Sequence, residues 1–265
     1  MSPQPNSVVE GWADADGDRI HYVEQGAGAP LLLVHGAFGG GHSFLQTAFG
    51  QALAARHRVI APDSLAHGDS AAPADRSRYG ARRRAGHLAA VLDAAGVQRA
   101  HVVGYSMGGW MASALATHHA DRIASLAVGG WDVVRGMYTP AAAWSLPEIT
   151  YDILAAMVRR ERPEKLAWLR PENEPALAAA VDAMNDLAGL AEGVARLSAP
   201  AAIWIGRDDL YHAAGGRYAE ANGLAFLSLP GDHISAIERH GSEAAEAVLG
   251  FINTAAARGR ETAVR

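Results

Sequence analysis

The sequence contains no cysteine among its 265 residues. Disulfide bonds, thiol nucleophiles and thiolate metal sites are therefore excluded for this chain. Lysine is also scarce, because Lys165 is the only lysine among 23 basic residues. The net charge of −5 excludes a general attraction to nucleic acid or to anionic membrane surfaces.

Long apolar runs are absent too. No run approaches the length of a membrane-spanning helix, and residues 1–18 lack a basic segment followed by an apolar core. We therefore expect neither a membrane anchor nor a secretory signal, and a cytoplasmic location by default. Apolar residues make up 49% of the chain and charged residues 19%, which is typical of a soluble globular protein with a sizeable core.

Strand patterns alternate with helical patterns along most of the chain. Short apolar runs predict strands at residues 7–13, 19–25, 30–34, 58–62, 100–103, 123–129, 201–205 and 224–229. Helical patterns occupy residues 43–55, 78–95, 109–117 and 241–257, and residues 255–265 read as a frayed tail. This alternation predicts an α/β fold with a doubly wound, mostly parallel sheet. Active groups in such sheets belong at the carboxyl ends of the strands.

The alternation is interrupted between residues 133 and 198. This stretch is rich in alanine, leucine and glutamate and is repeatedly broken by proline. We interpret it as a helical insertion between two strands, placed where it can cover the strand ends. Residues 1–132 and 199–265 then form one core domain.

Residues 104–108 (Gly-Tyr-Ser-Met-Gly) join a predicted strand to a predicted helix. The two glycines permit a sharp turn that lifts the Ser106 hydroxyl out of the sheet. The N-terminus of the following helix directs N–H groups at any negative charge that forms near that hydroxyl. The segment therefore indicates Ser106 as a nucleophile, the simpler alternative being a glycine-rich turn with an incidental serine.

A serine nucleophile needs a base within hydrogen-bond reach and a third group that orients the base. His233 follows the last predicted strand and precedes the last helix, so its loop can reach back to Ser106. Asp209, after the strand at residues 201–205, is our candidate for the orienting acid. Asp208 and Asp132 also follow predicted strands and remain alternatives.

Two backbone N–H groups are candidates for an oxyanion hole. The first is that of Met107, directly after the serine. The second belongs to the glycine-rich segment at residues 35–41, where Ala37 is our first choice and Phe38 the next. This segment has neither the Lys-Ser/Thr of a phosphate-binding loop nor the spacing of a dinucleotide fingerprint.

Aromatic residues gather near the predicted strand ends and in the insertion. The candidates for contact with a substrate are Phe38, Tyr105, Trp131, Tyr138 and Trp144. The basic run at residues 82–84 has no aromatic residues between its arginines, so we interpret it as a solvated helix face.

Five motifs in one order make the chain resemble the α/β-hydrolase family. They are His35-Gly36, residues 63–70 (Asp-Ser-Leu-Ala-His-Gly-Asp-Ser), residues 104–108, residues 206–209 (Gly-Arg-Asp-Asp) and residues 231–233 (Gly-Asp-His). The resemblance implies an eight-stranded, mostly parallel sheet with helices on both faces and a helical cap at residues 133–198. It also implies Ser106 as nucleophile, Asp209 as acid and His233 as base. Residues 64–66 depart from the proline-glycine more usual in the family, which leaves the loop shapes open.

We therefore expect a serine hydrolase that cleaves a carboxylic ester of a small or medium, largely apolar small molecule. We expect no cofactor and no metal, and the oligomeric state stays open. Thioesters, lactones and carbon–carbon bonds remain alternative targets for the same three residues. Lyase or oxygenase chemistry with His233 as base is another alternative, and a non-catalytic binder is a third.

Overall fold

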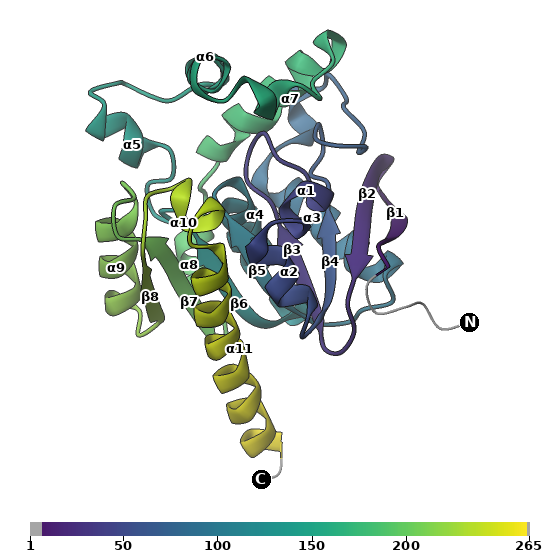
Figure 1. The fold of residues 1–265 in the computed structure, drawn as a ribbon, viewed down its shortest axis with the longest axis vertical. Helices are drawn as coiled ribbons and strands as arrows, with labels where there is room; N and C mark the ends of the chain where they lie inside the picture. Colours follow the sequence, from purple (N-terminus) through teal and green to yellow (C-terminus); the bar gives the residue numbers. More distant parts are fainter. Residues whose placement is uncertain (1–6, 264–265) are drawn as a thin grey trace.

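A computed structural model describes residues 7–263, with side chains for residues 7–257, and is built around one eight-stranded sheet (Figure 1). The strands are β1 (Val9–Ala15), β2 (Asp18–Gln25), β3 (Pro30–Val34), β4 (Arg58–Pro62), β5 (Ala100–Tyr105), β6 (Ile123–Gly129), β7 (Ala201–Gly206) and β8 (Ala225–Leu229). Their order in the sheet is β1-β2-β4-β3-β5-β6-β7-β8. β2 pairs antiparallel with β1 and β4, and the other neighbouring strands are parallel. The prediction of a mostly parallel sheet is confirmed.

Helices cover both faces of this sheet, as expected. One face packs against α1 (Gly41–Leu45), α2 (Ala48–Ala54), α10 (Ser235–Glu238) and α11 (Gly241–Ala263). The other packs against α3 (Ala81–Ala94), α4 (Met107–His118), α8 (Leu190–Ala195) and α9 (His212–Ala221). Short 3₁₀ turns lie at η1 (Arg76–Arg78) and η2 (Ala120–Arg122). The central strands β3 and β7 are apolar and buried along almost their whole length, because both of their faces are covered.

The tail predicted at residues 255–265 is wrong for most of its length, since α11 continues to Ala263. Its alanine-rich sequence favours continuation of the helix. Residues 1–6, part of the segment considered above for a leader, and residues 264–265 of the tail lie outside the described residues.

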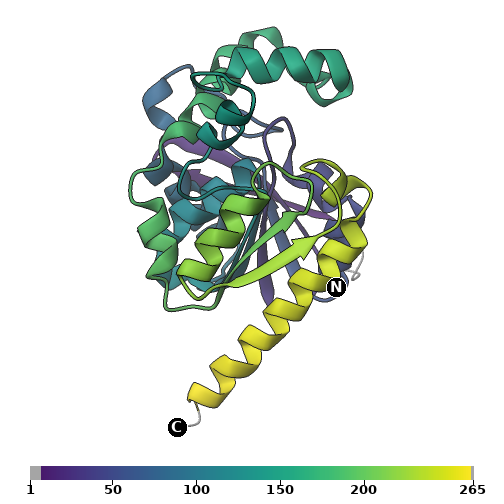
Figure 2. The same ribbon diagram turned by 90° about the vertical axis from the view of Figure 1, so that its left-hand side faces the viewer.

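The segment between β6 and β7 is helical. It contains α5 (Tyr138–Ala143), α6 (Tyr151–Glu161), η3 (Pro163–Leu166), η4 (Pro171–Asn173), α7 (Glu174–Asp182), η5 (Ala183–Asn185) and α8. Helices α5, α6 and α7 lie together at the end of the molecule opposite the C-terminus (Figures 1 and 2). Its last helix, α8, instead packs beside α4 in the layer over the sheet. No helix in residues 7–263 is both long enough and apolar enough to cross a membrane.

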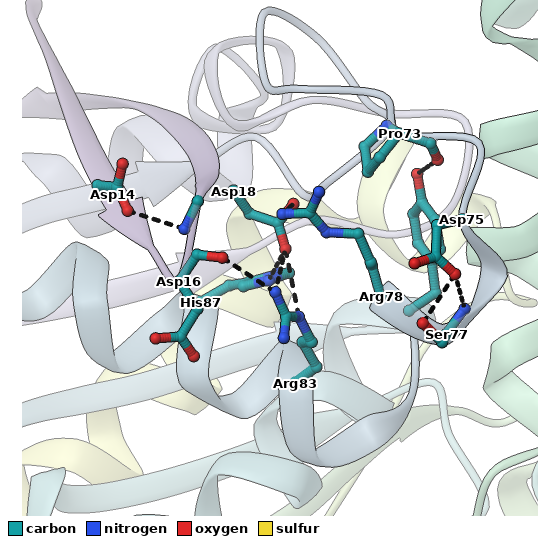
Figure 3. Close-up of polar contacts among 11 residues, drawn as sticks. Asp14, Asp16, Asp18, Pro73, Asp75, Ser77, Arg78, Arg83 and His87 are labelled. Carbon is teal, nitrogen blue, oxygen red and sulfur yellow. Dashed lines mark hydrogen bonds and ion pairs between the residues drawn. The ribbon is translucent and has the colours of Figure 1, made fainter.

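A buried carboxylate joins the β1–β2 hairpin to α3 (Figure 3). Asp18 is 0% exposed and forms ion pairs with Arg78 and Arg83. Nε2 of His87 lies 3.1 Å from Oδ2 of the same carboxylate. Burial and the nearby arginines lower the pKa of His87 to about 2, so the ring is neutral and Nε2–H donates this hydrogen bond.

The neighbouring Arg84 is also buried, so the prediction of a solvated face is wrong at this position. Its Nη1 donates to the carbonyl oxygen of Leu65 over 3.2 Å, and burial lowers its pKa to about 10. The physical reason is helical periodicity, because Arg84 shares the inner face of α3 with Ala81 and Leu88.

The environment of His87 predicts that acid destabilises the fold. In an unfolded chain its pKa is about 6.5, so the unfolded state takes up a proton that the folded state does not. Between about pH 6.5 and about pH 2 the free energy of unfolding therefore falls by about 1.4 kcal/mol for each unit of decreasing pH through this residue. Urea unfolding at a series of pH values below about 6.5 measures this slope.

We expect His87→Gln to make the slope shallower by about 1.4 kcal/mol per pH unit relative to the unsubstituted protein. Glutamine keeps an N–H donor for Asp18 but cannot take up a proton. The control is His42→Gln, since the side chain of His42 is exposed. Equal slopes for His87→Gln and the unsubstituted protein would contradict the prediction.

Candidate active site

Ser106 lies in the turn between β5 and α4, in a backbone conformation that few residues adopt. Its φ is 56° and its ψ is −118°, a strain of about 1–3 kcal/mol that the surrounding structure must offset. Its N–H donates to the carbonyl oxygen of Gly129 over 2.9 Å. A Cβ atom at Gly104 or at Gly108 would lie 2.1 Å from a backbone carbonyl oxygen, so both positions need glycine. The sharp turn expected at residues 104–108 is present.

Three side chains from the ends of different strands form a hydrogen-bonded chain. Nε2 of His233 lies 3.0 Å from Oγ of Ser106, and Nδ1 lies 2.8 Å from Oδ2 of Asp209. Asp209 is 7% exposed, and its Oδ1 accepts a hydrogen bond from the N–H of Tyr211. Because the carboxylate accepts from Nδ1–H, Nε2 carries the lone pair that faces the serine hydroxyl. Such an arrangement can remove the hydroxyl proton as the oxygen attacks an electrophile.

The two alternative acids are engaged elsewhere. Asp132 accepts three hydrogen bonds from the segment that leads into α5, the shortest being 2.6 Å from Oγ1 of Thr139. Asp208 has an exposed side chain, and its backbone N–H donates to the carbonyl oxygen of Gly231. Among the residues that the structure describes, neither carboxylate hydrogen-bonds to His233.

Unpaired backbone N–H groups lie beside Ser106. Within residues 7–263, the backbone N–H groups of Ala37, Phe38 and Met107 donate to no other group of the protein. Met107 directly follows Ser106, and a Cβ atom at Gly36 would lie 3.3 Å from Cβ of Ser106. The loop that carries Ala37 therefore lies against Ser106. Donors held this way can stabilise negative charge on an oxygen bound beside the serine.

His35 shapes this loop, a role that the sequence did not reveal. Its Nε2 accepts a hydrogen bond from the N–H of Ser64 over 3.0 Å, so the ring proton is on Nδ1. Nδ1–H then donates to the carbonyl oxygen of Gly36 over 2.7 Å. Burial lowers the pKa of His35, which keeps the ring neutral and this tautomer in place. The only signal in the sequence was its place before Gly36, directly after a buried strand.

A cavity of about 530 Å³ opens beside Ser106 and His233. Of the five aromatic residues predicted to contact a substrate, three line it: Phe38, Tyr105 and Trp144. Trp131 and Tyr138 are not brought to it. Trp131 is 1% exposed and packs in the core against Tyr211, with ring centroids 5.8 Å apart. Tyr138 begins α5 with its side chain 42% exposed.

One face of α6 forms part of the cavity wall, and the sequence analysis did not single it out. The residues are Leu154, Met157, Val158 and Glu161. Their spacing of three and four positions puts them on one side of a helix. That spacing is a signal in the sequence, but it does not say whether the apolar face covers a core or a cavity.

Charged side chains lie at one edge of the cavity. Arg162 and Lys165 follow α6, and Glu238 ends α10. Nη2 of Arg162 lies 2.9 Å from Oε1 of Glu238, and Nζ of Lys165 lies 3.4 Å from the same atom. The two cations therefore already have a carboxylate partner.

One group of side chains has the composition of a metal site. Ligand atoms of His21, Asp63 and Asp69 lie within 4.8 Å of one another. The carboxylate of Asp63 is already engaged, however, because it accepts from Nδ1 of His21 and from the N–H groups of Gly41 and Asp69. These contacts connect β2, the end of β4 and the start of α1. We therefore interpret the three side chains as a structural hydrogen-bonding group.

Known proteins with similar sequences belong to a family whose fold matches the one described above. A family model for the alpha/beta hydrolase fold matches residues 29–211. The 2-hydroxymuconate semialdehyde hydrolase of Pseudomonas putida is 36% identical over 153 residues, which are 54% of this chain and 54% of that protein. Haloalkane dehalogenase 2 of Mycobacterium tuberculosis is 33% identical over 156 residues, 57% of this chain and 54% of that protein. The chain thus spans about half the length of the curated relatives it matches.

A solved structure extends the likeness over nearly the whole chain. The enol-lactonase from Burkholderia xenovorans LB400 superposes with a TM-score of 0.70 at 25% sequence identity. The match covers 91% of this chain and 99% of the enol-lactonase. Together with the family model, this shows that the chain belongs to the α/β-hydrolase fold family.

Proposed function

We propose that this protein is a serine hydrolase that cleaves carboxylic esters of small or medium, largely apolar molecules through an acyl-enzyme on Ser106. The observation that carries the proposal is the hydrogen-bonded chain from Ser106 through His233 to the buried Asp209, at the wall of an apolar cavity. The helical segment at residues 133–198, as a cap, would supply much of that wall. The proposed reaction uses the three side chains as its catalytic groups and the cavity as its substrate site.

The reaction runs in two stages. As Oγ of Ser106 bonds to the ester carbonyl carbon, its proton passes to Nε2 of His233, and the carbonyl oxygen becomes an oxyanion. The N–H groups of Met107 and Ala37 hold that oxygen. The carbon–oxygen bond to the alcohol then breaks, and the alcohol leaves with the proton from His233. A water molecule, deprotonated by His233, attacks the acyl group and releases the acid.

The charge of the cavity disfavours an anionic substrate. Among the described residues that line the cavity, the permanently cationic ones are Arg162 and Lys165. Both form ion pairs with Glu238. A carboxylate on the substrate would have to displace Glu238 from these cations. Apolar side chains, among them Phe38, Leu154 and Met157, are numerous in the rest of the lining.

Hydrolysis of a lactone or of a carbon–carbon bond is the second candidate. It is supported by the 2-hydroxymuconate semialdehyde hydrolase and the enol-lactonase among the similar proteins. The same three residues can serve such reactions, so the two candidates differ in the substrate and share the site. A panel of p-nitrophenyl esters of increasing chain length, thioesters, lactones and 1,3-diketones separates them by kcat/KM.

A covalent trap tests the acyl-enzyme. We expect a fluorophosphonate to label the protein once, on the peptide that contains Ser106, and to abolish ester turnover in step with labelling. Ser43 also lines the cavity, but its Oγ forms hydrogen bonds with the backbone of Gly40. No histidine among the described residues hydrogen-bonds to it. Ser43→Ala should therefore label as the unsubstituted protein does, and Ser106→Ala should not label. Failure of the reagent to label Ser106 under conditions in which the protein still turns over esters would overturn the acyl-enzyme.

A further inference from the structure

Tyr105 connects the strand that carries the nucleophile to the loop that carries the base. Its hydroxyl donates to the backbone carbonyl oxygen of His233 over 2.7 Å. The two rings also lie together, with centroids 5.3 Å apart. Tyr105 is 6% exposed, so the donor side of this hydrogen bond is largely buried. A residue directly before the nucleophile thus holds the main chain of a residue 128 positions later.

The loop of His233 has few other attachments to the centre of the sheet. Within the loop, Oδ1 of Asp232 accepts from the N–H groups of Ile234 and Ser235, which stabilises its local shape. The N–H of Asp208 donates to the carbonyl oxygen of Gly231, which ties the loop to the end of β7. The Tyr105 hydroxyl supplies the corresponding tie to β5, on the side of Ser106.

The glycine at position 130 leaves room for this contact. A Cβ atom there would lie 2.8 Å from the ring of Tyr105 and 3.1 Å from Cε1 of His233. Both rings therefore occupy the space beside a residue without a side chain. Burial, with the carboxylates of Asp209 and Asp232 nearby, raises the pKa of Tyr105 well above its ordinary value. The hydroxyl is consequently protonated near neutral pH and can donate the hydrogen bond to His233.

We propose that Tyr105 is a positioning residue, whose hydroxyl holds the main chain of His233 so that Nε2 stays within reach of the Ser106 hydroxyl. The inference rests on the proposed function, because it assigns Tyr105 a part in the proton transfer between those two residues. Tyr105 acts through the backbone of His233 and takes no proton itself. Removal of the hydroxyl leaves the carbonyl oxygen of His233 without this donor and frees the loop to shift.

The substitution that tests this is Tyr105→Phe, which removes one oxygen and keeps the ring. A displacement of about 1 Å between reacting groups lowers rates about 10²-fold. We therefore expect kcat for a p-nitrophenyl ester to fall about 10- to 100-fold, with KM little changed. The low-field N–H resonance of the His233 ring, whose proton lies between Nδ1 and Asp209, should shift or broaden as well.

Tyr79→Phe is the matched control. The Tyr79 hydroxyl donates to the carbonyl oxygen of Pro73, also over 2.7 Å, and Tyr79 is 0% exposed. Figure 3 shows Pro73 near Asp75 and Ser77. Neither Pro73 nor Tyr79 is among the described residues that line the cavity beside Ser106. The two variants lose the same kind of hydrogen bond, so equal losses of thermal stability are expected, and only Tyr105→Phe should lose kcat.

A double substitution separates positioning from substrate contact, since Tyr105 also lines the cavity. In a His233→Ala background, Tyr105→Phe should lower the residual rate no further, because the group that it positions is gone. Wild-type kcat in Tyr105→Phe, a rise in KM in place of a fall in kcat, or an equal loss in the His233→Ala background would each overturn the proposal. Failure of the proposed function would appear separately, as absence of fluorophosphonate labelling in the unsubstituted protein.

Discussion

Ser106→Ala and His233→Ala are each expected to lower kcat for ester substrates by a factor of about 10⁶. The reason is that Oγ of Ser106 and Nε2 of His233, 3.0 Å apart, act as one unit. Without the hydroxyl there is no nucleophile, and without the imidazole the hydroxyl keeps its proton. Steady-state kinetics on the best p-nitrophenyl ester, with the protein concentration set by active-site titration, measures the loss.

The double variant gives the sharper form of this prediction. Because the two groups act together, Ser106→Ala combined with His233→Ala should be no slower than either single variant. The control is Ser113→Ala, because Ser113 is buried on α4 and its Oγ donates to the carbonyl oxygen of Gly109. Losses that multiply in the double variant would show that the two residues serve separate steps.

Asp209→Asn should lower kcat by a factor of about 10⁴ while the protein stays folded. Asn has nearly the same shape, but its neutral side chain cannot stabilise the imidazolium that forms when His233 takes the serine proton. Its amide N–H₂ can also present a donor to Nδ1, which moves the ring proton to Nε2 and removes the acceptor from Ser106. The effect should appear in kcat with KM nearly unchanged.

Aspartate-to-asparagine substitutions at Asp208 and Asp132 are the controls for the assignment of Asp209 as the acid. Asp208→Asn alters an exposed side chain and should leave kcat close to that of the unsubstituted protein. Asp132→Asn weakens hydrogen bonds that hold the entry to α5, so thermal stability should fall more than kcat. The assignment would be wrong if Asp209→Asn kept its kcat while Asp132→Asn or Asp208→Asn lost kcat by a factor of about 10⁴. The residue whose substitution caused that loss would then be the acid.

The parts of the site that follow strand ends were accessible from the sequence. In a parallel sheet, buried apolar runs mark the strands, and the residues directly after them meet at one edge. Ser106, Asp209 and His233 each follow such a run, so local pattern alone could place them near one another. Their hydrogen bonds in the structure agree with that placement.

The walls of the cavity were not accessible in the same way. Trp131 and Trp144 are both aromatic residues after β6, yet Trp144 lines the cavity and Trp131 is buried in the core. Which of them faces a substrate depends on how the helices at residues 133–198 pack, and these helices are connected by irregular segments with several prolines. Short-range patterns carry no information about that packing.

Arg84 and His35 illustrate a second limit. Charged and polar residues are usually placed at the surface from sequence alone, because burial without partners is unfavourable. Here the helical spacing puts Arg84 on the inner face of α3, where the carbonyl oxygen of Leu65 accepts its hydrogen bond. Nε2 of His35 likewise accepts from the backbone N–H of Ser64, which lies 29 positions later in the sequence. Such partners become visible only when the chain is folded.

The positive φ of Ser106 suits one residue type for stability and another for the proposed chemistry. A positive φ is unfavourable for every residue with a side chain except in special settings, and glycine would adopt it freely. At this one position, therefore, the residue that best suits the fold is one that has no hydroxyl. The strain of the backbone at residue 106 is therefore the cost of placing there the hydroxyl on which the proposed acyl-enzyme depends.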